Sequence, residues 1–304
     1  AWAMSLFEDN AEYAYGYLLG QDAVKRQLTE HVQALAESGI AVDACYAYLE
    51  KRDDPAFSRQ VSDALLAAIE NDSSDAAVFI RQNREYLTKK SVWAFGGDGW
   101  AYDIGYGGLD HVLASGRDIN VLVLDTEVYS NTGGQSSKAT AAGAIAKFSA
   151  GGKVTKKKDL GLMAMSYGYV YVAQVAMGAD PAQTLRAIRE AESYNGPSIV
   201  ICYCPCIEHG MKASMGLSQL EEKKAVECGY WHLYRYDPRL KAEGKNPFTL
   251  DSKAPTGDFQ QFLLGENRYA SLKLSFPEKA RELYEKAASD ARERYESYQA
   301  LAGK

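Results

Sequence analysis

The sequence predicts an α/β protein in which a parallel sheet carries helices on both faces, in three layers. Strand-like and helix-like patterns alternate from residue 91 to residue 203, as they do in parallel-sheet proteins. The strand-like runs are mostly apolar, as expected for strands that are buried on both sides. We therefore expect one open sheet, followed by an irregular C-terminal extension and a long terminal helix.

The N-terminal part is predicted to be helical. Residues 22–38 and 56–70 have amphipathic patterns, and Asn71-Asp72-Ser73 predicts a break and an N-cap before a third helix at about 74–88. In the second of these helices the apolar residues recur at helical spacing: Phe57, Val61, Leu65, Ala68 and Ile69.

The alternating strands and helices follow. We expect them at 91–95, 102–115, 119–125, 160–167, 169–176, 181–193 and 197–203. Asp180-Pro181 is a typical helix start, and Asn195-Gly196-Pro197 is a typical end.

The C-terminal part begins with an irregular segment. Between 236 and 266 the periodicity disappears and Asp-Pro, Asn-Pro and Ala-Pro pairs mark turns. Ser275-Phe276-Pro277 then starts a long helix with an apolar stripe, expected to pack on the domain or, alternatively, on another subunit. The stripe consists of Ala280, Leu283, Tyr284, Ala287, Ala291, Tyr295 and Tyr298. We expect a domain at 1–235 with a helical lead, and an extension at 236–304 packed on it.

Composition excludes several classes of protein. The 304 residues carry a formal charge of −6 and a pI near 5.4, which argues against a general nucleic-acid binder. No apolar run reaches the roughly 18 residues of a membrane span, and no secretory signal is visible. Five cysteines, an odd number, do not suggest a disulfide framework, so we expect a cytoplasmic protein. The first residue is Ala, as expected for a piece of a longer chain.

Two predicted strand ends carry candidate ligands for a metal and a diphosphate. Gly97-Asp98-Gly99 follows the first strand, where glycines let the backbone approach a phosphate and Asp98 offers an oxygen to Mg²⁺. Thr126 and Asn131 follow the second strand, and the carboxyl ends of neighbouring parallel strands are where such sheets bind ligands. The alternative is a plain strand-to-helix turn that Asp98 caps.

This pair of segments resembles the thiamine diphosphate motif, which opens with Gly-Asp-Gly and closes with an Asn about thirty residues later; here 33 residues separate Asp98 from Asn131. The longer strings, from Gly97 to His111 and from Asp125 to Thr140, resemble pyruvate:ferredoxin (flavodoxin) oxidoreductases. Further similar segments are Ser5–Glu12, Lys158-Asp159, Tyr167–Val172, Gly229–Trp231, Tyr236–Leu240, Gly244–Phe248 and Leu250–Pro255.

The resemblance covers nearly the whole chain and implies its function. It implies the thiamine diphosphate-binding fold and the C-terminal part of a much longer enzyme. That enzyme oxidatively decarboxylates pyruvate, passes the acetyl group to coenzyme A and delivers electrons to ferredoxin or flavodoxin. A homodimer is expected. The glutamate that activates the cofactor and the pyruvate-binding residues lie upstream in the family, so this chain alone should not turn over pyruvate.

The resemblance also implies roles for individual residues. Asp98, the Thr126 hydroxyl and the Val128 carbonyl would ligate Mg²⁺, and Asn131 would lie near the reacting substrate, where its amide can stabilise charge. The segments expected to hold the cofactor comprise Gly97, Asp98, Gly99, Trp100, Thr126, Glu127, Val128, Tyr129, Ser130 and Asn131.

A cysteine cluster follows the last predicted strand. The spacing of Cys202, Cys204 and Cys206 is not that of a common zinc or redox pair, and buried thiols are an equal alternative. By resemblance, Cys206 supplies the fourth thiolate of a [4Fe-4S] cluster whose other ligands lie upstream. Cys202 and Cys204 match no ligand position, and Cys45 and Cys228 are expected to be structural.

Other candidates are weaker. Lys153 and Lys156–Lys158 form a basic run, expected to be a solvated loop or a docking patch for an acidic electron carrier. The four histidines have no metal-ligand spacing. Alternative functions are another 2-oxoacid:ferredoxin oxidoreductase and a non-catalytic assembly module with the same fold. A dinucleotide-binding domain is disfavoured, because no Gly-x-Gly-x-x-Gly follows the strand at 91–95.

Overall fold

The computed structural model describes residues 10–303, which form two compact units: Tyr13–Val92, and the part from Trp93 onward together with residues 10–12. The expected domain boundary at residue 235 stays a prediction. The described residues contain no helix with the length and apolarity that a membrane crossing requires. Most of the family-like segment Ser5–Glu12 lies outside the described residues.

The unit at 13–92 is helical. Its elements are α1 (Ala11–Glu37), α2 (Val42–Lys51), α3 (Ser58–Ala68), α4 (Asp75–Gln82) and the 3₁₀ turn η1 (Arg84–Tyr86). Leu28, Leu65 and Ile80 are fully buried in a shared core, which also contains Cys45. Ser74 caps α4 by accepting the N–H of Ala77 at 3.4 Å, so the cap lies one residue after the predicted break and N-cap at Asn71-Asp72-Ser73.

Three features of this unit differ from the prediction. The third predicted helix, at about 74–88, is shorter, since α4 ends at Gln82 and a 3₁₀ turn follows it. Helix α1 starts at Ala11, eleven residues before the predicted start at residue 22, and the prediction missed its first turns because they lack a continuous apolar stripe. Helix α2 was not predicted, since its ten residues are too few to show a clear period.

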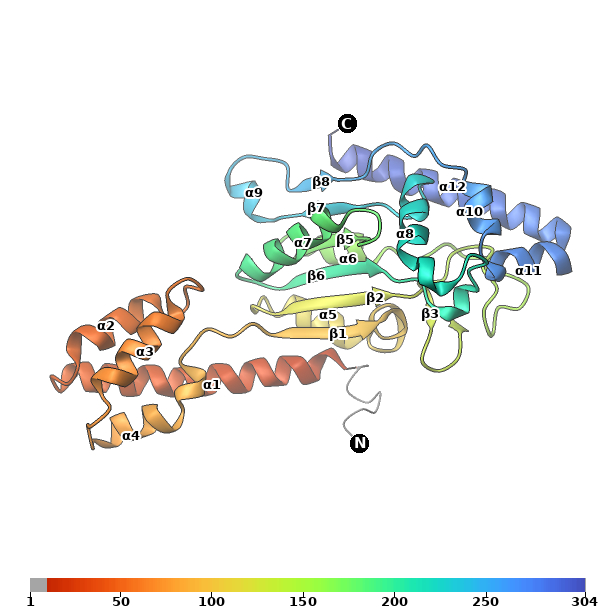
Figure 1. Cartoon of the computed structure of the whole chain (residues 1–304). Coiled ribbons are helices and arrows are strands. Elements are labelled where there is room, and N and C mark those ends of the chain that lie inside the picture. The colour runs from red at the N-terminus through yellow and green to blue at the C-terminus, as the bar shows by residue number, and fades with distance from the viewer. Residues whose placement is uncertain (1–9, 304) are drawn as a thin grey trace. The chain divides into compact units, whose positions relative to one another are not determined.

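Among the residues described, six strands form one sheet in the order β1-β2-β6-β5-β7-β8 (Figure 1). The first four in this order are parallel, and the last two join antiparallel. The strand bounds are β1 Trp93–Gly97, β2 Asn120–Asp125, β5 Tyr171–Val175, β6 Ser198–Tyr203, β7 Tyr234–Tyr236 and β8 Phe248–Leu250. The predicted parallel sheet is thus extended by an antiparallel edge, whose three-residue strands are too short for a periodicity signal.

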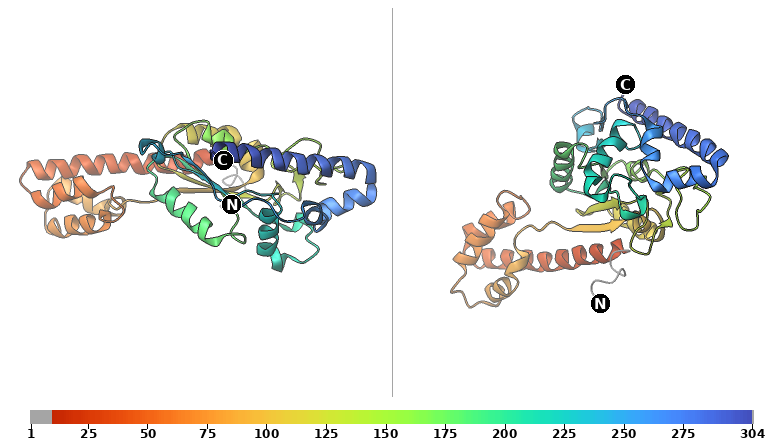
Figure 2. Two further views of the ribbon diagram at one scale, coloured as in Figure 1. Left: turned by 90° about the horizontal axis from the view of Figure 1, so that it is seen from above. Right: turned by 45° about the vertical axis from the view of Figure 1, so that its right-hand side comes forward.

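Helices cover both faces of the sheet, as predicted. Helix α5 (Tyr106–Ala114) joins β1 to β2, and α7 (Pro181–Ser193) joins β5 to β6 in the opposite direction along the strand order. Because such crossovers are right-handed, opposite directions place the two helices on opposite faces. Seen from above, α7 and α8 (Ser218–Glu227) lie on one side of the strands and α12 (Pro277–Leu301) on the other (Figure 2).

The C-terminal segment is more regular than expected. It contains β8, α9 (Arg239–Ala242), α10 (Phe259–Leu264) and α11 (Asn267–Ser275) before α12. The stripe of α12 packs within its own unit: Ala280 and Tyr298 are fully buried, and the Tyr298 hydroxyl donates to Oδ2 of Asp159 at 2.6 Å. This packing supports the first of the two alternatives for the stripe.

Short elements complete the unit. They are the π-helical turn η2 (Gly99–Ile104), the hairpin strands β3 (Val128–Tyr129) and β4 (Gln135–Ser136), α6 (Leu160–Met165), and the 3₁₀ turns η3 (Ile207–His209) and η4 (Met215–Leu217).

Candidate functional site

A cavity of about 350 Å³ lies at the carboxyl ends of β1 and β2. Two segments line it, and both are segments that the motif analysis selected. The lining residues are Phe95, Gly96, Gly97, Asp98, Gly99, Trp100, Leu124, Thr126, Val128, Tyr129, Ser130, Asn131 and Thr132. The structure therefore brings together the predicted cofactor-binding residues with the exception of Glu127.

Close packing explains the glycines of this cavity. A Cβ atom at Gly99 would lie 2.4 Å from the Tyr129 ring, and one at Gly96 would lie 2.2 Å from the Trp100 ring. Side chains at these positions would push an aromatic ring out of place. The glycines thus let the turn after β1 approach both the second segment and the indole of Trp100.

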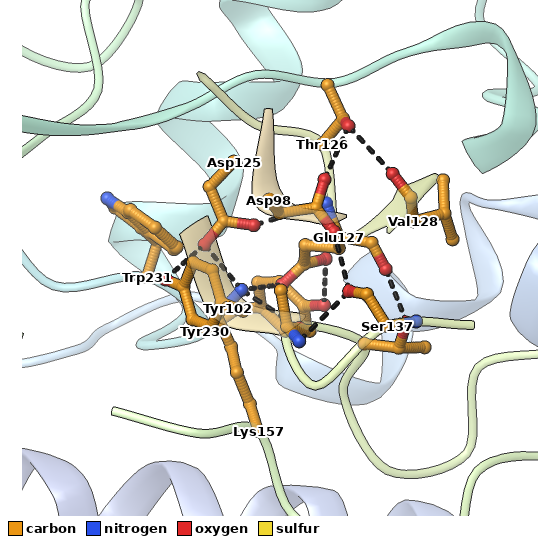
Figure 3. Close-up of polar contacts among 12 residues, drawn as sticks. Asp98, Tyr102, Asp125, Thr126, Glu127, Val128, Ser137, Lys157, Tyr230 and Trp231 are labelled. Atoms are coloured by element: carbon orange, nitrogen blue, oxygen red, sulfur yellow. Dashed lines mark hydrogen bonds and ion pairs between the residues drawn. The ribbon is translucent and has the colours of Figure 1, made fainter. Parts of the chain in front are cut away.

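The three predicted magnesium ligands meet at one point (Figure 3). The Thr126 hydroxyl lies 2.8 Å from Oδ1 of Asp98 and 3.0 Å from the carbonyl oxygen of Val128. The other carboxylate oxygen of Asp98 accepts a hydrogen bond from the Ser137 hydroxyl at 2.5 Å. One carboxylate, one hydroxyl and one carbonyl form an all-oxygen donor set, which is the type that Mg²⁺ prefers.

Charge at this point also fits a cation. Asp98 is fully buried, and burial, followed by the nearby Asp125, raises its pKa to about 7. A divalent cation beside the carboxylate would favour its ionised form. Trp100 also lines the cavity, and its indole N–H is buried and has no hydrogen-bond partner in the described part of the chain. The residues present therefore fit a diphosphate and its metal.

Glu127 lies between two of the metal-ligand candidates but points away from the cavity, into a buried cluster of charges (Figure 3). Its carboxylate pairs with Nζ of Lys157 at 3.1 Å and with Nη2 of Arg268 at 2.8 Å. Burial alone would raise the pKa of Glu127, but Lys157 and Arg268 together outweigh burial and lower the pKa to about 2. Glu127 is therefore a buried anion.

The lysines of the basic run at 153–158 do not all lie in a solvated loop or in an exposed docking patch. Lys157 is buried and pairs with Asp125 at 2.7 Å, and Lys153 donates to the backbone oxygen of Ser137. Lys158 donates to the carbonyl of Tyr102, and burial lowers its pKa to about 8. Lys156 remains exposed. Sequence analysis missed these roles because consecutive lysines are usually solvated.

The cysteines after β6 have different surroundings. Burial raises the pKa of Cys202 to about 12 and also raises that of Cys204, so both remain protonated thiols. Cys206 is the N-cap residue of the 3₁₀ turn η3. Its backbone N–H donates to Nδ1 of His209 at 3.1 Å, and its sulfur accepts the backbone N–H of His209. Within residues 10–303, no group of three or more His, Cys, Asp or Glu side chains has the arrangement of a metal site.

Comparisons with known proteins identify relatives of this chain. Residues 76–202, which include β1, β2 and β5, match the model of the thiamine pyrophosphate enzyme C-terminal TPP-binding domain. The chain is 58% identical over 313 residues to a pyruvate:ferredoxin oxidoreductase of Moorella thermoacetica, covering 99% of this chain and 26% of the relative. It is 57% identical over 308 residues to a pyruvate-flavodoxin oxidoreductase of Klebsiella pneumoniae, covering 100% and 26%.

The chain spans about a quarter of the length of these curated relatives. A solved structure of a 2-oxoglutarate:ferredoxin oxidoreductase of Magnetococcus marinus aligns with 41% of this chain and 43% of its own, at 24% identity and a TM-score of 0.37. That structural similarity is too low to support a conclusion.

Proposed function

Because the chain is homologous over its whole length to pyruvate:ferredoxin and pyruvate-flavodoxin oxidoreductases, we propose that it is the thiamine- and magnesium-binding part of such an enzyme. The complete enzyme would decarboxylate pyruvate oxidatively, form acetyl-coenzyme A and pass two electrons to ferredoxin or flavodoxin. The homology favours this function over that of a non-catalytic module. The observation that carries the proposal is the convergence of Asp98, Thr126 and Val128 at one cavity.

The residues around the cavity would hold and orient the cofactor. Asp98, the Thr126 hydroxyl and the Val128 carbonyl would ligate Mg²⁺, and diphosphate oxygens and water would complete its shell. Gly97 and Gly99 let the backbone approach the diphosphate. When bound, thiamine diphosphate supplies the electron sink for decarboxylation, while the protein supplies placement and electrostatics.

Other components of the reaction would come from the rest of the longer protein. Cys206 would give one thiolate to a [4Fe-4S] cluster, with the other three ligands in a segment upstream of residue 1. The contacts to coenzyme A and to pyruvate, further clusters, and a second copy in a homodimer would also lie outside this chain.

The test is a substitution at the metal position. Asp98→Asn keeps the size of the buried side chain but removes its charge, so it should abolish Mg²⁺-dependent binding of thiamine diphosphate, measured by titration calorimetry. Asp110→Asn is the control: Asp110 accepts the Tyr167 hydroxyl at 2.7 Å and does not line the cavity, so binding should be unchanged. Normal binding by the Asp98 variant, or no Mg²⁺-dependent binding by the parent chain, contradicts the proposal.

A further inference from the structure

In the sequence, Glu127 lies beside the metal-ligand candidates, but this position does not reveal the role of its side chain. We infer that Glu127 is a positioning residue, whose buried ion pairs hold the turn that presents the Thr126 hydroxyl and the Val128 carbonyl. The inference rests on the proposed function, because it assumes that these two oxygens ligate Mg²⁺.

The backbone of Glu127 is held in an unusual conformation. Its φ is +59°, in the left-handed region that favours glycine and that other residues adopt only where the surrounding structure imposes it. The N–H of Glu127 donates to Oδ1 of Asp125 at 3.1 Å, and its carbonyl accepts the hydroxyl of Thr140. With Glu127 in this conformation, the Thr126 hydroxyl contacts both the Val128 carbonyl and Oδ1 of Asp98.

The side chain of Glu127 is anchored on both oxygens. Oε1 accepts from Lys157, and Oε2 accepts the Tyr230 hydroxyl at 2.6 Å and pairs with Arg268. These partners come from three parts of the chain that are distant in sequence, and all are buried. A carboxylate that is bound at both oxygens by donors from three directions has little freedom to move. The anchored side chain therefore restrains the backbone of the turn.

The cations of the cluster do not depend on Glu127 alone. Lys157 also pairs with Asp125 at 2.7 Å, and Arg268 also pairs with Glu266 at 2.7 Å. Neutralising Glu127 therefore leaves each buried cation with another carboxylate. Loss of a partner is costly for a buried charge only when no other partner remains. Because Lys157 and Arg268 each keep a carboxylate, the fold should tolerate Glu127→Gln.

Glu127→Gln nevertheless disturbs the position of the turn. Both carboxylate oxygens accept from donors, whereas an amide accepts on one side and donates on the other. The amide nitrogen must face Lys157, or else Tyr230 and Arg268, so the side chain has to shift. The isosteric variant thus changes the anchoring without leaving a cavity.

The experiment measures Mg²⁺ affinity at saturating thiamine diphosphate, together with the melting temperature, for the whole chain and its variants. Glu127→Gln should weaken Mg²⁺ binding about 10- to 100-fold, the range for lost partners of metal ligands. The matched control is Glu190→Gln: Glu190 accepts from Arg235 at 2.7 Å, and Arg235 keeps Asp251 as a second partner. This control should lower the melting temperature without changing Mg²⁺ affinity.

Glu127→Gly separates the side chain from the backbone. Glycine adopts the left-handed conformation readily, so if only that conformation matters, this variant binds Mg²⁺ as the parent does. Loss of affinity in both Glu127 variants supports the inference. Parent-like affinity in either one, whatever the melting temperature, overturns it. A parent chain without Mg²⁺-dependent binding would instead contradict the proposed function.

Discussion

At the residue scale, Asn131 is the residue that we propose to contact the substrate and not the metal. It is an exposed residue that lines the cavity, three positions beyond Val128 and outside the group of Asp98, Thr126 and Val128 oxygens. An amide at that place can stabilise charge on a reacting substrate without contributing to the metal site.

We predict that Asn131→Ala in the complete enzyme lowers turnover about tenfold to a thousandfold, the range for losing one preorganised donor. Affinity for Mg²⁺ and thiamine diphosphate should change less, because the metal ligands are intact. Steady-state kinetics and cofactor titration on the same preparation test this. If Asn131 only shapes the turn, affinity falls instead and turnover at saturating cofactor stays normal.

At the element scale, the π-helical turn η2 places Asp98 and Trp100 beside the second segment. A π-helical turn is rare and occurs frequently at functional sites. Here it follows directly on Asp98 and is packed so closely that Gly99 contacts the ring of Tyr129. The shape of the cavity therefore depends on the absence of a single methyl group.

We predict that Gly99→Ala destabilises the protein by about 1–3 kcal/mol, the cost of overpacking a close contact. It should also weaken thiamine diphosphate binding, because Tyr129 lines the cavity and would be displaced. Denaturant unfolding and cofactor titration provide the two measurements.

Gly107→Ala is the matched control for this prediction. It lies in helix α5, where a Cβ meets nothing within 4 Å, so alanine should leave binding unchanged and stabilise the helix by up to about 1 kcal/mol. Equal behaviour of the two variants would show that the contact at Gly99 has no role.

At the scale of the whole molecule, the unit from Trp93 onward buries ionisable groups that make its stability depend on pH. His232 is 1% exposed, and burial, followed by Arg294, lowers its pKa from 6.5 to about 3. As pH falls from 6.5 toward 3, the unfolded chain takes up a proton that the folded chain does not. Stability therefore decreases toward acid, by about 1.4 kcal/mol per pH unit for such a group.

We predict that His232→Gln makes the stability less dependent on pH between 6.5 and 4. Part of the dependence should remain, because burial also lowers the pKa of His209. Denaturant unfolding at several pH values gives the slopes for parent and variant. Identical slopes would mean that His232 does not titrate as its burial implies.

The sequence by itself determined the α/β class, the positions of the main strands along the chain and the two segments at the cavity. These features depend on local patterns: apolar runs, glycine turns and oxygen-bearing residues at strand ends. Nine of the lining residues, the four from Gly97 to Trp100 and five among 126–131, follow from the motif alone.

Only the tertiary structure decided which way side chains point and which distant residues meet. Glu127 belongs to the motif by sequence, yet it faces a buried cluster, and Lys157 lies in a basic run, yet it is buried with Asp125. The antiparallel strands β7 and β8 are also identified only by their pairing, β7 with β5 and β8 with β7. The physical reason is that the burial of a charge is set by partners far along the chain, which local periodicity does not record.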